Sequence, residues 1–320
     1  VEDKDACPVY PGRYIRGVNN RAETPKWMKD RLAAIGLHSI SPLVDVTNYV
    51  NFDLARPLHV FDADKLKGSL TIRMAEEGEK FVSLEGKEYT LDNRSLGICD
   101  DEGVQCLGVM GGAAKGCGED TVNVLLESAY FKPGCIARTG RHFQIESDSR
   151  YRYERWVDPN SNVMGSDYAT ALILDICGGE ASEITVCGEE NYKPAPVCLR
   201  PERVKTLAGL DVSEDEIVRI LTALGFEVSR ENGCLKTVSP TWRGDIECEA
   251  DLVEEVVRMA GLDNIPALSM PADEFPKQTL NPAQRRAVTV KHELAARGMF
   301  ETVTWSFTDS KLAGFFRKSG

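Results

Sequence analysis

Polar residues that suit an ester or a ribose hydroxyl gather early in the chain. Thr47 and Asn48 lie in one short segment, and His59 follows a few residues later, directly after Arg56-Pro57-Leu58. Together a hydroxyl, an amide and an imidazole offer the donors and acceptors that hold a water molecule or an ester group. The alternative is that His59 is a partly buried histidine whose hydrogen bonds are satisfied inside the fold.

A glycine-rich segment and a carboxylate come next. Gly111 and Gly112 follow Met110 directly, and glycines either let the backbone approach a ligand closely or simply provide positive φ angles. Glu127 comes directly after the apolar run 124–126. A charge in that place is either a solvated strand end or a group presented to a ligand.

Arginines and aromatic residues alternate between Arg138 and Trp156. The further members of this segment are Arg141, His142, Phe143, Arg150, Tyr151, Arg152, Tyr153 and Arg155. Guanidinium groups and aromatic rings suit a nucleic-acid strand, because they pair with phosphates and stack on bases. Glu146, Asp148 and Glu154 dilute the positive charge, so ion pairing inside the protein is the alternative.

Four carboxylates near the end of the chain have the spacing of a cation site. Asp245 precedes a predicted helix, and offsets of three and four residues place Asp251, Glu254 and Glu255 on one face of it. Unpaired, these carboxylates would repel one another, and Mg²⁺ would relieve that repulsion through oxygen ligands. A solvated acidic face is the alternative.

Composition excludes several other classes of protein. The sequence has no P-loop, no H-E-x-x-H and no G-x-S-x-G motif, and it contains only 4 histidines. Its 38 Lys and Arg against 50 Asp and Glu give a net charge of −12, which argues against a protein whose whole surface binds nucleic acid. No apolar run reaches the roughly 18 residues of a membrane span. The 10 cysteines lack C-x-x-C spacing, so we expect reduced thiols in a cytoplasmic protein.

The elements that must position these residues indicate an α+β fold. A helix is predicted from the Thr24-Pro25 cap to Gly36, and another near 161–177. Strand-like runs fall at 44–47, 70–74, 97–99, 107–110 and 122–126. Many short strands with few helices predict a mixed, β-rich first domain rather than alternating βαβ units.

A smaller unit follows a linker at 191–196. Ser213 and Glu216 form a capping box, Asn232-Gly233 marks a β-hairpin, and a second helix is expected from Glu249 to Ala260. Helix, hairpin and helix in this order resemble a winged or helix-turn-helix-like module. A last helix capped at Asn281 and a strand at 302–307 complete the chain, and because both ends interrupt the pattern, we expect it to be part of a longer protein.

In their order along the chain, several segments resemble the β subunit of bacterial phenylalanyl-tRNA synthetases. They are Leu43–Val50, Arg56–Asp62, Met110–Gly112, Asn123–Glu127, Arg152–Arg155 with Val157-Asp158-Pro159, and Asp245–Glu255. The resemblance implies a B3/B4-type editing domain over residues 1–192, a B5-type domain over 197–271, and the start of a catalytic-like domain over 272–320.

The resemblance also implies roles for the candidate residues. In this family the first domain hydrolyses tyrosine wrongly esterified to tRNA(Phe), which implies His59 and Glu127 as catalytic residues, with Glu127 sensing the tyrosine hydroxyl. The implied substrate-binding residues are Thr47, Asn48, Met110, Gly111, Gly112, Ser147 and Ser149. The implied metal ligands are Asp245, Asp251, Glu254 and Glu255, for a Mg²⁺ shared with the α subunit.

Further expectations concern partners. The resemblance implies an α2β2 heterotetramer that binds tRNA(Phe), with no membrane contact, in which ATP is used only by the whole enzyme because the aminoacylation site belongs to the α subunit. A non-catalytic scaffold that contacts RNA is the alternative function. Two positions depart from the family pattern: Ser149 stands where Ala is expected, and Trp156 stands where Gly is expected.

Overall fold

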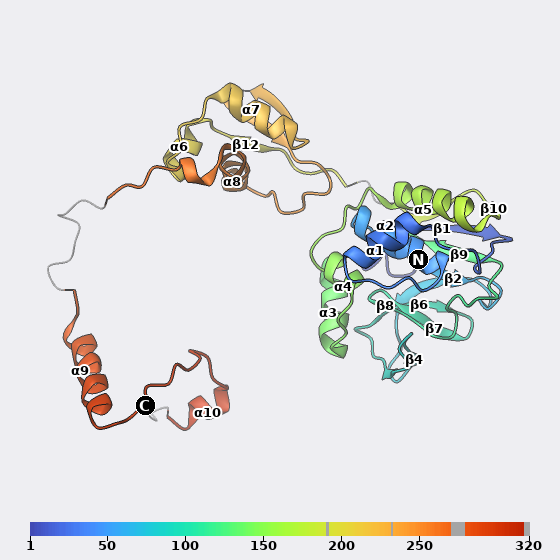
Figure 1. Ribbon diagram of the computed structural model, residues 1–320, viewed down its shortest axis with the longest axis horizontal. Helices are drawn as coiled ribbons and strands as arrows, with labels where there is room; N and C mark the ends of the chain where they lie inside the picture. The colour runs from blue at the N-terminus through green and yellow to red at the C-terminus, as the bar shows by residue number, and fades with distance from the viewer. Residues whose placement is uncertain (190–191, 232, 270–278, 317–320) are drawn as a thin grey trace. The chain divides into compact units, whose positions relative to one another are not determined.

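The computed structural model describes residues 1–189, 192–231, 233–269 and 279–316. The chain divides into two compact units, Val1–Ile265 and Pro266–Gly320. The candidate residues all lie in the first unit, which is an α+β structure with several antiparallel sheets (Figure 1).

A central antiparallel sheet organises the first part of the chain. Its strands are ordered β10 (Glu180–Ala181), β1 (Val9–Arg16), β9 (Val124–Glu127) and β2 (His59–Asp62), and β11 (Thr185–Gly188) also pairs with β1. Side chains alternate between the two faces of a strand. Val60, Val124 and Leu126 therefore pack into one core, whereas Phe61 packs into another on the opposite face.

Helices cover the first of these faces. They are α1 (Lys26–Ala34), α2 (Pro42–Asp53) and α5 (Asn162–Cys177), whose buried residues Met28, Leu43, Val50 and Ile173 share a core with the sheet (Figure 1). The opposite face packs against a second sheet, ordered β3 (Thr71–Met74), β6 (Leu96–Asp100), β7 (Gly103–Leu107) and β8 (Met110–Gly111). The hairpin β4 (Lys80–Val82) and β5 (Glu88–Thr90) and the helices α3 (Pro133–Phe143) and α4 (Asp148–Tyr153) complete this part.

Three local predictions in this region are wrong. The strand expected at 107–110 is instead the turn between β7 and β8. Residues 44–47 belong to helix α2 rather than to a strand, because Pro42 sits in the first turn of a helix whose Leu43, Val46 and Val50 face the core. Helix α1 begins at Lys26 with Pro25 as its cap, and the Thr24 hydroxyl instead donates to Asp45 at 2.6 Å. The predicted runs at 70–74, 97–99 and 122–126 match β3, β6 and β9 to within a few residues.

A smaller region with its own core follows along the chain. Its elements are β12 (Val197–Leu199), α6 (Glu202–Ala208), α7 (Glu214–Ala223), β13 (Glu227–Glu231), β14 (Cys234–Val238), α8 (Glu249–Ala260) and the 3₁₀ turn η1 (Leu262–Asn264). Ser213 caps α7 by accepting from the Glu216 amide, but the Glu216 carboxylate pairs with Arg219, so only half of the predicted capping box forms. Strand β13 pairs with β14 as the expected hairpin. Part of the hairpin turn, Asn232, lies outside the described residues, as does the start of the predicted linker.

The structure pairs two cysteines in this region. Cys198 and Cys234 form a disulfide, with Cα atoms 5.9 Å apart, so the expectation of reduced thiols is wrong for this pair. The cause is strand pairing: β12 runs antiparallel to β14, which places Cys198 opposite Lys236, close to Cys234. The other eight cysteines are free.

The second unit contains α9 (Pro282–Ala296) and α10 (Ser310–Gly314). Asn281 and Gln284 form a capping box at the start of α9, as the sequence predicts. The strand expected at 302–307 is absent from the described residues: these side chains alternate in type, but the segment has no strand partner.

Candidate active site

A small cavity of about 80 Å³ lies between the central sheet, the second sheet and helix α4. Its walls are Pro57, Leu58, His59, Cys106, Leu107, Gly108, Met110, Gly111, Glu127, Phe131, Ser149 and Tyr153. Most of these side chains or backbones are apolar, and the imidazole of His59 and the carboxyl group of Glu127 lie among them. An apolar cavity with a few convergent polar groups has the general character of a ligand site.

Strand register brings His59 and Glu127 together. His59 lies directly opposite Glu127 in the antiparallel pairing of β2 with β9. Opposite residues project from the same face of a sheet, with Cβ atoms about 5 Å apart. That face is the one turned toward the second sheet, because Phe61, two residues after His59, packs into the core there.

Burial controls the ionisation of Glu127. The side chain is almost fully buried, which raises the pKa of its carboxyl group to about 7, although a hydrogen bond from Tyr10 opposes the rise. The Tyr10 hydroxyl donates to Oε2 at 2.8 Å, and within the described residues Oε1 has no hydrogen-bond partner. One oxygen of a buried carboxyl group is therefore available to a hydroxyl that enters the cavity.

Burial affects His59 in the opposite sense. Desolvation lowers the pKa of its imidazole to about 4, so the ring is neutral at physiological pH. Its Nε2 atom is buried and has no hydrogen-bond partner among the described residues. The ring packs edge-on against Phe61, and Gly111 leaves it room, since a Cβ atom at Gly111 would lie 2.6 Å from the imidazole Cε1. The prediction that His59 makes satisfied hydrogen bonds does not hold for Nε2.

The structure gathers some of the predicted substrate-binding residues and not others. Met110, Gly111 and Ser149 line the cavity together with His59 and Glu127. The predicted members that do not line it are Thr47, Asn48, Gly112 and Ser147.

Each of these four has another position in the fold. Thr47 is buried in α2, where its hydroxyl donates to the Val44 carbonyl at 2.9 Å, and Asn48 lies half-buried on the same helix. Gly112 lies against the backbone of Gln105: a Cβ atom added at Gly112 would lie 2.2 Å from the Gln105 carbonyl oxygen. Ser147 caps α4, and its hydroxyl donates to the Val109 carbonyl at 2.6 Å.

Sequence reasoning missed Tyr10 and Tyr153. The Tyr153 hydroxyl donates to the Ala129 carbonyl at 2.8 Å, and both tyrosines are buried. Tyr153 belongs to the arginine-rich segment, where the sequence pattern indicates only a surface for stacking. Nothing in the sequence near Tyr10 pointed to the site, because its partner Glu127 lies 117 residues away.

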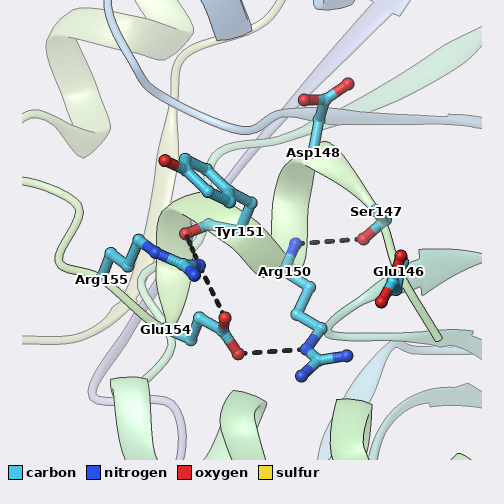
Figure 2. Close-up of a pocket in the computed structure, with 7 residues that line it drawn as sticks. All are labelled: Glu146, Ser147, Asp148, Arg150, Tyr151, Glu154 and Arg155. Carbon is cyan, nitrogen blue, oxygen red and sulfur yellow. Dashed lines mark hydrogen bonds and ion pairs between the residues drawn. The ribbon is translucent and has the colours of Figure 1, made fainter. Parts of the chain in front are cut away.

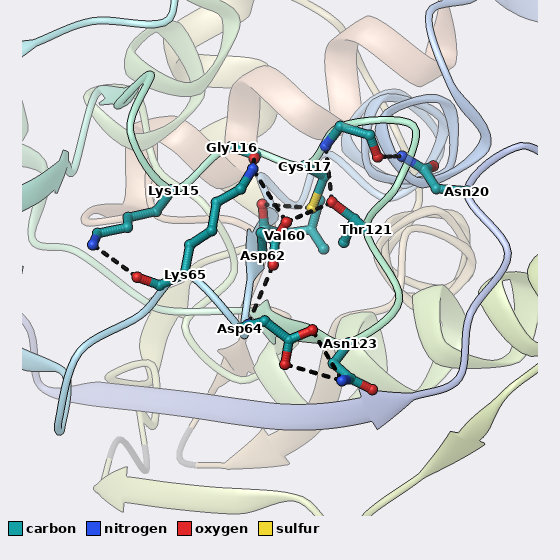
Figure 3. Close-up of polar contacts among 11 residues, drawn as sticks. Asn20, Val60, Asp62, Asp64, Lys65, Lys115, Gly116, Cys117, Thr121 and Asn123 are labelled. Atoms are coloured by element: carbon teal, nitrogen blue, oxygen red, sulfur yellow. Dashed lines mark hydrogen bonds and ion pairs between the residues drawn. The ribbon is translucent and has the colours of Figure 1, made fainter.

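A fully buried arginine fixes the loops behind the cavity. Arg56 donates to the Ala129 carbonyl at 2.8 Å and to the Ser161 hydroxyl at 2.9 Å, and it also contacts the Asp158 carbonyl. These bonds tie the start of β2 to the end of β9 and to the turn before α5. The other end of β2 is held by Asp62, which accepts from Thr121 at 2.7 Å and pairs with Lys65 at 3.1 Å (Figure 3).

The arginine-rich segment forms mainly internal ion pairs. Glu154 pairs with Arg150 at 3.0 Å and with Arg155 at 2.6 Å, and Asp148 pairs with Arg152 at 3.1 Å. The structure thus supports the ion-pairing interpretation for these three arginines. Figure 2 shows Glu154 between the guanidinium groups of Arg150 and Arg155.

Three of the four carboxylates predicted to bind Mg²⁺ have other partners in the described residues, and the fourth, Glu254, is exposed. Asp251 accepts hydrogen bonds from the Glu247 and Cys248 amides, both at 2.8 Å, and so caps α8. Glu255 is buried and pairs with Arg243 at 2.9 Å and Arg258 at 2.7 Å. Asp245 is held by Arg243, and Glu254 is exposed.

This arrangement does not fit a magnesium ion. Arginines pair with Asp245 and Glu255, and backbone amides donate to Asp251. These contacts lower the pKa of Asp251 and of Glu255. In the described part of the chain, no three His, Cys, Asp or Glu side chains come close enough to hold a metal. Nor is any described helix long and apolar enough to cross a membrane.

Comparisons with known proteins find similar domains and similar chains. A family model described as the B3/4 domain matches residues 6–178, and one described as the tRNA synthetase B5 domain matches 197–262. A solved N-terminal fragment of the phenylalanyl-tRNA synthetase beta subunit from Pyrococcus horikoshii is 18% identical, with a TM-score of 0.38, over 80% of this chain and 71% of that chain.

Among curated relatives, the chain is 50% identical over 316 residues to the phenylalanine–tRNA ligase beta subunit of Paramagnetospirillum magneticum, and 52% identical over 314 residues to that of Rhodospirillum rubrum. These alignments include 98% and 97% of this chain but only 40% and 39% of the relatives. The chain thus spans about two fifths of the length of these relatives. Because the B3/4 model matches more than half of its residues, the chain belongs to the B3/4 domain family and resembles, along nearly its whole length, part of phenylalanine–tRNA ligase beta subunits.

Proposed function

We propose that the cavity between β2, β9 and α4 is an editing site that hydrolyses tyrosine wrongly esterified to tRNA(Phe). The observation that carries this proposal is the buried Glu127 carboxyl group, which lies opposite His59 and has one oxygen without a hydrogen-bond partner in the described residues. A tyrosine differs from a phenylalanine by one hydroxyl group, and this oxygen is the acceptor that such a hydroxyl needs.

Glu127 supplies the discrimination. When a tyrosine side chain occupies the cavity, its hydroxyl donates to the Oε1 atom of Glu127, while Tyr10 continues to donate to Oε2. A phenylalanine would leave the desolvated carboxyl group without a hydrogen-bond donor, which costs binding free energy. A site that binds a substrate hydroxyl therefore binds an analogue without that hydroxyl more weakly. At 80 Å³ the cavity holds several water molecules, so its wall must move to admit the aromatic ring.

The hydrolysis itself needs a positioned water molecule. Its oxygen attacks the ester carbonyl carbon, the bond between that carbon and the ribose oxygen breaks, and a proton passes to the ribose oxygen. The neutral imidazole of His59 has an unpartnered Nε2 atom to hold the water or the ester. An aminoacyl ester is already activated, so orientation of the reactants supplies much of the required acceleration.

The remaining functions belong to the larger assembly. We propose that the chain acts within a phenylalanine–tRNA ligase together with an α subunit, in an α2β2 heterotetramer that binds tRNA(Phe). Charging with phenylalanine and the use of ATP then belong to the whole enzyme, and the purified chain alone will not charge tRNA. We assign no step to magnesium, because three of its four predicted ligands have other partners.

The test is deacylation of Tyr-tRNA(Phe) by the assembled enzyme. Glu127→Ala should reduce the preference for Tyr-tRNA(Phe) over Phe-tRNA(Phe) by roughly 10- to 100-fold, because a hydrogen bond to a charged group contributes about 1.5–3 kcal/mol. His59→Ala should lower the rate for both esters. A matched control is Tyr14→Ala, an exposed tyrosine on β1 that does not line the cavity.

One result would favour the alternative of a non-catalytic scaffold that contacts RNA. That function predicts salt-dependent binding of tRNA without any deacylation, and weaker binding when Arg138 or Arg141 is replaced. If both cavity variants deacylate at the rate of the unaltered enzyme with unchanged preference, the editing site is not in this cavity.

A further inference from the structure

A second hollow lies on the outer side of helix α4. It has a volume of about 580 Å³ and is lined by Glu146, Ser147, Asp148, Arg150, Tyr151, Glu154 and Arg155 (Figure 2). We refer to these seven residues as the α4 groove. Its lining is mainly charged, unlike that of the cavity that contains Glu127.

Helix α4 forms a wall of both hollows. Ser149 and Tyr153 line the cavity, whereas their sequence neighbours Asp148, Arg150 and Glu154 line the α4 groove. Ser147 adds a direct link, since its hydroxyl bonds the Val109 carbonyl next to the cavity residue Met110. The two hollows therefore lie on different faces of one short helix, which is about 10 Å wide with its side chains.

The groove contains a planar platform. The guanidinium carbon of Arg155 lies 4.0 Å from the centroid of the Tyr151 ring, so the two planar groups are in contact. Arg155 is fixed by hydrogen bonds to the Glu154 carboxylate at 2.6 Å and to the Tyr151 carbonyl at 3.2 Å. The Tyr151 side chain is nevertheless 58% exposed, which is unusual for a large aromatic group held in one place. A held and exposed ring suits stacking by a flat ligand.

The charges of the groove select the kind of ligand. Arg150 and Arg155 share Glu154, and Asp148 is paired with Arg152. With Arg152 included, three arginines face three acidic residues, so the groove has no excess of positive charge to attract a phosphate. Glu146 and Asp148 present exposed carboxylate oxygens that accept from ribose hydroxyls or from an exocyclic amine. The matching ligand is an uncharged ring with such donors, which is a nucleoside.

We propose that the α4 groove binds the 3′-terminal nucleoside of the RNA whose aminoacyl ester enters the cavity. The base stacks on the Tyr151–Arg155 platform, and its amine or ribose donates to Glu146 or Asp148. This inference rests on the proposed editing function, since it names the part of the substrate that lies outside the cavity.

Binding of uncharged RNA tests the groove without any hydrolysis. Two short single-stranded oligoribonucleotides are compared with the intact chain: one ends in a 3′ adenosine, and the other has an abasic 3′ residue. Stacking of one base contributes about 1–3 kcal/mol, so the abasic oligonucleotide should bind roughly 5- to 100-fold more weakly. Equal affinities would overturn the proposal, and so would free adenosine binding as tightly as the oligonucleotide, because the groove would then be a site for free nucleosides.

Variants locate the effect at the platform. Tyr151→Ala should abolish the difference between the two oligonucleotides, Tyr151→Trp should preserve it, and Arg155→Lys should reduce it because lysine lacks a planar group. Tyr14→Ala is the control, and thermal unfolding of each variant confirms that it is folded. A difference that persists unchanged in Tyr151→Ala would overturn the assignment to this groove.

Kinetics separate this inference from the editing function. In the assembled enzyme, Tyr151→Ala should raise the KM for Tyr-tRNA(Phe) by a similar factor while kcat stays within twofold. If the unaltered enzyme shows no deacylation but the oligonucleotides still differ in a Tyr151-dependent way, the proposed function fails and the groove remains. If deacylation proceeds but Tyr151→Ala changes neither KM nor RNA binding, the groove proposal fails alone.

Discussion

Two residues that face each other across a pair of strands have pKa values displaced in opposite senses by the same cause. Burial disfavours the charged form of either group, so the pKa of Glu127 rises to about 7 and that of His59 falls to about 4. At neutral pH the pair therefore consists of a neutral imidazole and a carboxyl group that is half ionised. This arrangement gives the site a polar group on each of two strands without placing two full charges in an apolar cavity.

The pair makes opposite contributions to the pH dependence of stability. Between about pH 4.5 and 7 the folded chain holds a proton on Glu127 that the unfolded chain releases, so this group stabilises the fold at low pH and loses that effect as the pH rises. For His59 the unfolded chain binds the proton between about pH 4 and 6.5, so stability rises with pH over that range. Near pH 5.5 the stability contributions of the two groups change with pH in opposite directions and at similar rates, so the two slopes largely cancel.

Single variants should reveal each effect. The unfolding free energy of Glu127→Gln minus that of the unaltered chain should increase by roughly 3 kcal/mol from pH 4.5 to pH 7. The same difference for His59→Asn should decrease by a similar amount from pH 4 to pH 6.5. Urea unfolding at several pH values measures both differences, and two flat differences would show that neither group is desolvated as the structure indicates.

At the scale of elements, the short strand β8 determines how close the backbone comes to His59. A Cβ atom at Gly111 would lie 2.6 Å from the imidazole and 3.0 Å from Leu84, so Gly111→Ala should displace the ring. We expect deacylation by the assembled enzyme to fall at least 10-fold, with only a small change in thermal midpoint. Gly118→Ala is the matched control, because nothing lies within 4 Å of the added Cβ atom there. Equal activity of the two variants would mean that the position of the ring is unimportant.

Helix α8 gives a second prediction at this scale. Asp251 accepts from two backbone amides before the helix, so Asp251→Ala should cost about 1 kcal/mol of stability, as loss of a helix cap usually does. The cost should be the same in Mg²⁺ and in a chelator. Thermal unfolding in both buffers is the measurement, and a stability of the unaltered chain that depends on Mg²⁺ would restore the predicted metal site.

The elements also show what the sequence could and could not predict. Helices α5, α7, α8 and α9 were predictable because their caps and apolar spacing are local signals. Helix α2 was not, because Val44 and Val46 on either side of Asp45 give the alternation of a half-buried strand. In the fold, Leu43, Val46 and Val50 pack as one helical face into the core shared with the sheet and α5. In the site, His59 and Glu127 were identified with the help of the family resemblance, whereas Tyr10 depended on pairing between strands far apart in the sequence.

At the scale of the whole molecule, one residue links the region of α4 to the region of α8. Trp156, which follows α4, donates from its indole nitrogen to the Thr241 carbonyl at 3.0 Å and packs against Tyr192. Its φ angle is +93°, a value that favours glycine. The neighbouring Arg243 holds both Asp245 and Glu255, so the contact reaches the ion pairs at the base of α8.

Two replacements of Trp156 should separate backbone strain from side-chain contact. Trp156→Ala loses the contact and keeps the strain, whereas Trp156→Gly loses the contact and relieves the strain. We therefore expect the glycine variant to be more stable than the alanine variant by about 1 kcal/mol, in the reverse of the usual order. Calorimetry measures the difference, and an alanine variant that is the more stable would show that the backbone there is relaxed.

The volume around Trp156 has a consequence for the history of the sequence. A Cβ atom at Gly244 would lie 2.1 Å from the indole ring, so the large residue at 156 tolerates only the smallest one at 244. A lineage that carries glycine at 156 has space there for a bulky side chain at 244, and the two positions should have exchanged sizes together. Each double change would then leave the join between the two regions filled, while an intermediate with two large residues would be selected against.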